Sequence, residues 1–124
     1  METFNYKPYV KSLVKYMLDN GYTQKPLPIL VLNDKKQKGV FISTGKYMPS
    51  DKLIVLYINE RHPKDVLRSL AHELIHHNQY IDGDLTEDMC AERITDSKQI
   101  VPLEEEAYLK GNIAFRSWTE TFTK

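Results

Sequence analysis

The sequence predicts a single α+β domain in which helices accompany a small antiparallel sheet. Apolar residues recur with helical spacing in three segments, at residues 8–20, 62–81 and 101–119. Between the first two of these lie three short runs with the composition of strands. The length of 124 residues allows one hydrophobic core and leaves no room for a second independent domain.

The three predicted strands cover residues 27–32, 39–47 and 53–58. The segment 48–51, with the sequence Met-Pro-Ser-Asp, has the chemistry of a turn. We therefore expect the second and third strands to pair as an antiparallel hairpin.

Each predicted helix has a recognisable start. Pro8 precedes the first helix, His62-Pro63 opens the second and Pro102 lies in the first turn of the third, where proline is tolerated. His62 is expected to cap its helix or lie on the surface. Three acids, 104–106, lie near the positive end of the dipole of the last helix, which ordinarily serves dipole compensation and solubility.

The second helix carries the sequence His72-Glu73-Leu74-Ile75-His76. Histidines four residues apart differ by about 40° around a helix, so both imidazoles project from one face and can hold a small metal ion. Zn²⁺ is the expected metal ion, and Glu73 would take a proton from the water that zinc activates. A five-residue pattern can occur by chance, so the neighbouring residues have to show whether this one is a metal site.

Helical phasing separates this motif from the apolar side of the helix. Glu73 and both histidines fall on one side with Ser69, and the apolar stripe on the other side contains Leu67, Leu70, Ala71, Leu74 and Ile81. This separation favours a helix that buries one face and offers the other to a cleft. His77 lies near the margin of the apolar stripe, which favours a structural or supporting role over a role as ligand.

A catalytic zinc ion usually has three protein ligands, so a third is needed. The inward stripe of the last helix is predicted to contain Leu103, Ala107, Ala114 and Trp118, with Tyr108, Gly111 and Phe115 beside it. Glu104 falls on this inner side, Glu106 falls almost opposite and Glu105 is intermediate. An acid on an apolar face is costly unless it is paired or binds a metal, so Glu104 is the predicted third ligand. The small residues of the stripe also let this helix approach another closely.

Residues 72–76 followed by Glu-Glu-Glu-Ala at 104–107 resemble the gluzincin group of zinc metallopeptidases, in which a glutamate from a second helix is the third zinc ligand. The order of elements resembles the short minigluzincins, and similar zincin-like proteins occur in phages and bacteria. Tyr108 stands where relatives have an acid that supports a ligand histidine, so Tyr108 or Glu106 would have to supply that support. The resemblance implies a zincin-like fold and an extended peptide substrate along an edge strand, for which 53–58 is the candidate.

These observations predict a zinc-dependent peptidase in which Glu73 is the general base, with zinc bound by His72, His76 and Glu104. Tyr108 or His77 would stabilise the oxyanion. The alternative is a non-catalytic, zinc-stabilised protein-binding or regulatory domain, and an inactive relative with an intact motif is a further possibility. Glu73 distinguishes them, because a purely structural zinc site needs no general base.

Composition limits the partners. The formal net charge is zero and the basic residues are scattered, which argues against binding of nucleic acid or of an anionic membrane. No apolar run approaches membrane-spanning length, and residues 1–6 lack the pattern of a secretory signal. The single cysteine, Cys90, suits a reducing compartment. A peptide or protein substrate and a cytoplasmic location are therefore expected, and the oligomeric state is left open.

Overall fold

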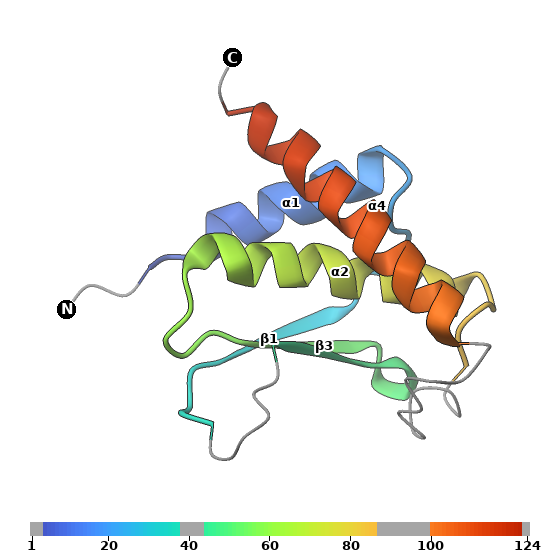
Figure 1. Ribbon diagram of the computed structural model, residues 1–124, viewed down its shortest axis with the longest axis horizontal. Coiled ribbons are helices and arrows are strands. Elements are labelled where there is room, and N and C mark those ends of the chain that lie inside the picture. Colours follow the sequence, from blue (N-terminus) through green and yellow to red (C-terminus); the bar gives the residue numbers. More distant parts are fainter. Residues whose placement is uncertain (1–3, 38–43, 87–99, 123–124) are drawn as a thin grey trace.

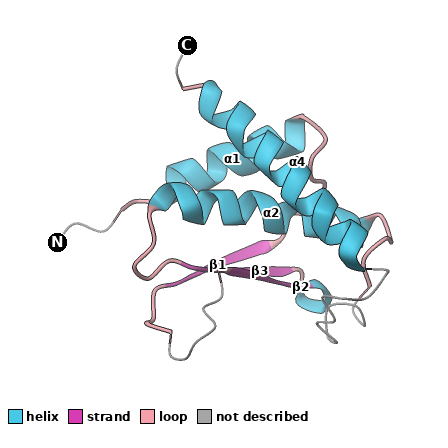
Figure 2. Cartoon of the chain, viewed as in Figure 1, coloured by secondary structure: helices cyan, strands magenta, loops and turns pink. Residues whose placement is uncertain are grey.

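The computed structural model describes residues 4–37, 44–86 and 100–122. Within these residues three α-helices lie on one side of a small sheet, as Figures 1 and 2 show. The predicted α+β class is therefore confirmed at this level. Cys90 lies outside the described residues.

Helix α2, Pro63–Ile81, is the middle layer of the fold. It contacts strands on one side, and α1 (Lys7–Asp19) and α4 (Ile100–Glu120) on the other (Figure 1). Because neighbours cover it on both sides, most of its second half is buried. The helix that carries the histidine motif is thus the most enclosed element among those described.

The helix bounds agree with the sequence signals to within one or two residues. α2 begins as predicted, with the Nδ1 atom of His62 accepting a hydrogen bond of 3.0 Å from the backbone N–H of Lys64. Beyond α1, Gly21 adopts a φ of 78°, a left-handed conformation that glycine adopts readily. Over the described residues, none of the helices is long and apolar enough to cross a membrane.

The sheet consists of β1 (Ile29–Asn33), β2 (Gly45–Met48) and β3 (Leu53–Tyr57), in the order β1-β3-β2. β2 and β3 form the predicted antiparallel hairpin, with a short 3₁₀ turn at Pro49–Asp51 between them. β1, however, pairs with β3 in parallel. The prediction of a wholly antiparallel sheet is therefore wrong, and the sheet is mixed.

The sheet is mixed because of the position of β3 in the strand order, and not because any strand runs in an unexpected direction. β3 runs opposite to β2 and parallel to β1, so successive strands along the chain do alternate in direction. β3 nevertheless lies between β1 and β2, which makes its contact with β1 parallel. This placement also makes β3 the central strand, so the expectation that residues 53–58 form a substrate-binding edge is wrong.

The hydrophobic core lies between the sheet and the helices. Ile54 and Leu56 are fully buried and alternate with partly buried residues along β3, so one face of this strand points into the core. The other fully buried side chains of the core cluster include Leu13, Met17, Val66, Leu70 and Leu74. Trp118 of α4 is also buried, and its indole N–H donates a hydrogen bond of 2.9 Å to the hydroxyl of Ser12. α1, α2 and α4 are therefore joined in one core.

Helix α4 crosses α2 at backbone distance. Ala107, Gly111 and Ala114 are buried as predicted. A Cβ atom added to Gly111 would lie 3.1 Å from Cα of His72 and 3.2 Å from its backbone nitrogen. Only glycine fits this contact without movement of a backbone, so Gly111 determines how closely α4 approaches the histidine motif.

Candidate metal centre

Three side chains predicted as ligands lie together where α4 crosses α2. The Nε2 atoms of His72 and His76 are 3.2 Å apart. A carboxylate oxygen of Glu104 lies 2.7 Å from Nε2 of His76, and the other lies 3.7 Å from Nε2 of His72. One ligand atom from each of the three residues falls within 4.8 Å of the others.

This donor set fits a divalent metal ion. Two nitrogens that bind zinc tetrahedrally lie about 3.3 Å from one another, close to the separation of the two Nε2 atoms. Two histidines and one glutamate are a set found in catalytic zinc sites, where a fourth position stays open for water or substrate. The site is thus able to hold zinc through His72, His76 and Glu104.

The charges of the site favour a cation between these side chains. The imidazoles of His72 and His76, which lie 3.7 and 2.7 Å from its carboxylate, hold the pKa of Glu104 well below its usual range. Burial is the largest single influence on the pKa of His76 and lowers it. The hydrogen bonds to Glu104 and Gln79 and the charges of Glu73 and Glu104 together outweigh burial, so the pKa of His76 is raised. The cluster therefore stabilises positive charge at the point where a metal ion would lie.

Glu73 lies on α2 beside this cluster but is covered by the sheet. Its side chain is 8% exposed, and a Cβ atom added to Gly45 of β2 would lie 3.3 Å from its Cγ and 3.4 Å from its Oε2. Burial raises the pKa of Glu73, while the nearby charges of His76 and His72 act in the opposite direction. The expectation of an open polar face is therefore wrong for Glu73 and for His76, which is 7% exposed, because β2 and α4 cover that face.

Gln79 orients His76, and the sequence analysis missed it. Its amide nitrogen donates hydrogen bonds of 2.9 Å to the carbonyl of Leu103 and 3.0 Å to Oε1 of Glu106. Its amide oxygen must then face Nδ1 of His76, 2.8 Å away, and accept a hydrogen bond from it. This leaves Nε2 of His76 as the atom available to a metal. The signal was present, because a residue three positions after His76 shares its helix face.

Glu106 therefore supports the site through Gln79 rather than directly. Its carboxylate accepts from Gln79 and also forms an ion pair of 3.2 Å with Lys110, and hydrogen bonding to Gln79 lowers its pKa. Among the described residues, none supports His72 in a comparable way. Its buried Nδ1 atom has no hydrogen-bond partner among the described residues, and the ring of Tyr108 packs against its ring with centroids 4.5 Å apart. The two histidines are thus held by different means.

His77 points away from the cluster into the protein. Its Nε2 lies 2.6 Å from the carbonyl oxygen of Pro26, which can only accept, so Nε2 carries the proton. In the neutral ring its Nδ1 then accepts the hydrogen bond of 2.7 Å from the hydroxyl of Tyr47. Burial lowers the pKa of His77, which favours this neutral form. Because both ring nitrogens are occupied and the side chain is fully buried, His77 has a structural role and no donor left for a substrate.

Arg61 fixes the position of β2 relative to α2, and no local sequence pattern predicts this role. One guanidinium nitrogen donates to the carbonyls of Thr44, at 2.9 Å, and Tyr57, at 2.7 Å. The other donates to the carbonyl of Asp65, at 3.0 Å, and the hydroxyl of Ser69, at 2.8 Å. Arg61 thereby joins the start of β2 and the end of β3 to the first turns of α2. This fork helps to hold β2 over Glu73.

Of the predicted residues, the structure brings together His72, His76 and Glu104, with Tyr108 against His72. Glu73 is beside them under β2, and His77 is not part of the group. Comparison of the chain with protein-family models, with curated proteins and with solved structures gives no match.

Proposed function

We propose that the protein is a zinc-dependent peptidase of gluzincin type. The observation that carries the proposal is the convergence of His72, His76 and Glu104 on one point, beside Glu73 of the helix that carries the two histidines. A structural zinc site would need only the ligands. The buried acid with a raised pKa is the additional group that hydrolysis requires.

Glu73 acts as the general base and then as the general acid. Zinc, when bound, polarises the scissile carbonyl and lowers the pKa of a water molecule toward neutrality. Glu73 accepts the proton of the attacking water and returns it to the leaving amine, while Gln79 keeps His76 in the tautomer that presents Nε2. The cover of β2 over Glu73 excludes bulk water, which strengthens its electrostatic interactions.

The substrate would lie along β2 rather than β3. Among the described strands β2 lies at an edge of the sheet, and its residue Gly45 lies next to Glu73. An extended peptide that pairs with this edge would have its backbone close to the metal centre. Tyr108 remains the candidate oxyanion donor, because its side chain is 61% exposed and its ring contacts the ring of His72.

The test combines metal analysis with a peptide-library cleavage assay on wild-type protein and on the variants Glu73→Gln and Glu73→Ala. We expect about one zinc per chain in all three proteins, and cleavage by wild type alone, since loss of a general base removes turnover without removing the ligands. Full cleavage by Glu73→Gln would contradict the proposed mechanism. Cleavage by none of the proteins, with zinc bound by all, would favour the non-catalytic domain.

The third ligand is tested by three neighbouring alanine substitutions. Glu104→Ala should lose zinc, because its carboxylate lies nearest the two imidazoles. Glu105→Ala should keep it and serves as the matched control. Glu106→Ala should bind zinc more weakly than wild type but retain it, because Glu106 acts through Gln79. Retention by Glu104→Ala together with loss by Glu106→Ala would show that the ligand is wrongly assigned.

One observation favours a structural contribution of the metal in addition. Its proposed ligands come from both α2 and α4, so a bound ion would connect the two helices. A ligand that binds the folded state and not the unfolded state raises the free energy of unfolding by mass action. A chelator should therefore lower the melting temperature of the zinc-loaded protein, and a melt indifferent to chelator would contradict this role.

A further inference from the structure

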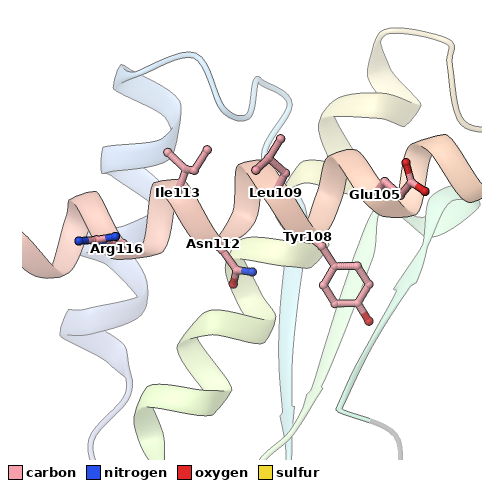
Figure 3. A pocket seen from close by; sticks show the side chains of 6 residues that line it. All are labelled: Glu105, Tyr108, Leu109, Asn112, Ile113 and Arg116. Carbon is pink, nitrogen blue, oxygen red and sulfur yellow. The ribbon is translucent and has the colours of Figure 1, made fainter.

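A shallow groove runs along the side of α4 that faces away from the core. Six residues line it, and all belong to α4: Glu105, Tyr108, Leu109, Asn112, Ile113 and Arg116 (Figure 3). Leu109 is 63% exposed and Ile113 is 45% exposed, although both are large apolar residues. The buried side of the same helix is formed by Ala107, Gly111 and Ala114. Among the groove residues, Tyr108 contacts α2 through the ring of His72.

Four of these residues form a seam with the spacing of a helix pair. Glu105, Leu109, Asn112 and Arg116 are separated by four, three and four residues, which is the spacing of the residues by which paired helices contact each other. Tyr108 and Ile113 lie on the two flanks of this seam. The seam has an acid at one end and a base at the other, about 16 Å apart along the helix.

The distribution of charge makes this seam complementary to itself. Glu105 and Arg116 are equally distant from its midpoint, and Leu109 and Asn112 are also symmetric about that point. When two such helices lie antiparallel about a twofold axis, each Glu105 meets the partner's Arg116 and each Leu109 meets the partner's Asn112. We propose that α4 mediates a homodimer by this antiparallel pairing.

A second copy of the chain fits the seam better than an unrelated partner does. An unrelated helix would have to supply the reversed order of charges, whereas a copy carries it in Glu105 and Arg116. The formal net charge of zero means that two copies do not repel one another as a whole. Arg116 also lies 3.4 Å from Glu120 of its own helix, but this exposed pair is weak and leaves the guanidinium available to a stronger partner.

The proposed dimer would border the metal centre. Tyr108 lies on one flank of the seam, and its ring is 4.5 Å from the ring of His72. In an antiparallel pair the same flanks of the two helices adjoin, so the Tyr108 side chains of the two copies would lie near one another. Dimer formation would therefore bury part of Tyr108 and restrict its movement over His72.

Charge reversal on the full-length protein tests the pairing, with sedimentation velocity over a concentration series as the measurement. Wild type should show a monomer–dimer equilibrium. Glu105→Arg alone and Arg116→Glu alone should each weaken the dimer by about tenfold or more, because each places like charges opposite one another twice. The double variant Glu105→Arg/Arg116→Glu restores the opposite pairs and should return to within about threefold of wild type. Leu109→Asp should abolish the dimer.

The controls show whether a loss of dimer comes from the proposed contacts or from a change in net charge or folding. Lys35→Glu, in the turn after β1, changes the net charge as Arg116→Glu does and should leave the dimer unchanged. Circular dichroism verifies that each variant is folded. Folding is expected to be retained because the substituted positions are exposed. The proposal is overturned if wild type is monomeric up to about 1 mM. It is also overturned if Leu109→Asp still dimerises, or if the double reversal fails to restore what the single reversals remove.

Discussion

The amide oxygen of Gln79 faces Nδ1 of His76 at 2.8 Å, and two acceptors that face its amide nitrogen fix the orientation of the amide. Its nitrogen donates to the carbonyl of Leu103 and to the carboxylate of Glu106, neither of which can donate in return. A single buried amide therefore selects the tautomer of one proposed ligand. It also connects that ligand to α4.

Gln79→Leu should weaken zinc binding by about 10–100-fold, because His76 then lacks the acceptor that holds its ring. The measurement is a competition titration against a chromophoric chelator. Asn78→Leu is the matched control, since Asn78 is the neighbouring amide and contacts Gln24 and Asp82 instead of the metal centre. Equal affinity in wild type and Gln79→Leu would refute the orienting role without affecting the assignment of the ligands.

Gly45→Ala should lower turnover while zinc binding is retained. The added methyl group would lie 3.3 Å from Cγ of Glu73, so the carboxylate has to shift by a few tenths of an ångström. A general base displaced in this way loses rate, here by roughly tenfold or more. Steady-state cleavage and metal content are measured together, with Lys46→Ala as the control in the same strand. Loss of zinc from Gly45→Ala would mean that the strand positions the ligands instead of the base.

Gly111→Ala should destabilise the fold. Its methyl group would lie 3.1 Å from Cα of His72, and a backbone atom cannot move aside as a flexible side chain can. We expect a loss of about 1–3 kcal/mol in the free energy of unfolding, the usual range for overpacking. Urea denaturation measures it, with Asn112→Ala as an exposed control on the same helix. A Gly111→Ala protein as stable as wild type would show that α4 can be displaced from α2 at little cost.

Zinc and protons should compete at His76, with opposite effects of pH on the two forms of the protein. The raised pKa of His76 means that its contribution to the stability of the metal-free protein is fully present below the ordinary histidine pKa. That contribution is lost as the pH rises through the folded-state value. Zinc requires the neutral ring, so the increase in melting temperature that zinc causes should grow over the same interval.

Melting curves from about pH 6 to pH 9, with and without zinc, measure both effects. The lowered pKa of Glu104 contributes stability that is lost only at far more acidic pH, so it does not change within this interval. His76→Asn should remove both trends. A shift in melting temperature that stays constant with pH would argue against His76 as a ligand.

Much of the fold follows from local signals, and the arrangement of the sheet does not. Pro63 and the cap at His62 define the start of α2, and turn chemistry at Pro49–Asp51 defines the hairpin. Each of these signals lies within a few residues of the feature that it specifies. The parallel pairing of β1 with β3 depends on which edge of the hairpin β1 reaches, and no local pattern encodes that choice.

The candidate site shows the same division. Helical phasing predicts that His72 and His76 share one face, and the cost of an acid on an apolar face predicts Glu104 as their partner. It could not show that β2 would cover Glu73 or that Arg61 would fasten β2 to α2, since both depend on contacts between distant segments. Tyr108 was expected beside the inward stripe and is instead mainly exposed.

The position of Glu104 near the beginning of α4 has a consequence for the lifetime of a bound ion. α2 is enclosed between the sheet and two helices, whereas Glu104 lies in the second turn of a helix that starts at Ile100. Helix ends open at a lower free energy than enclosed segments do. The rate at which zinc dissociates should therefore be set by how often the first turns of α4 open. The ion would then exchange with solution while α2 keeps its amide protons protected.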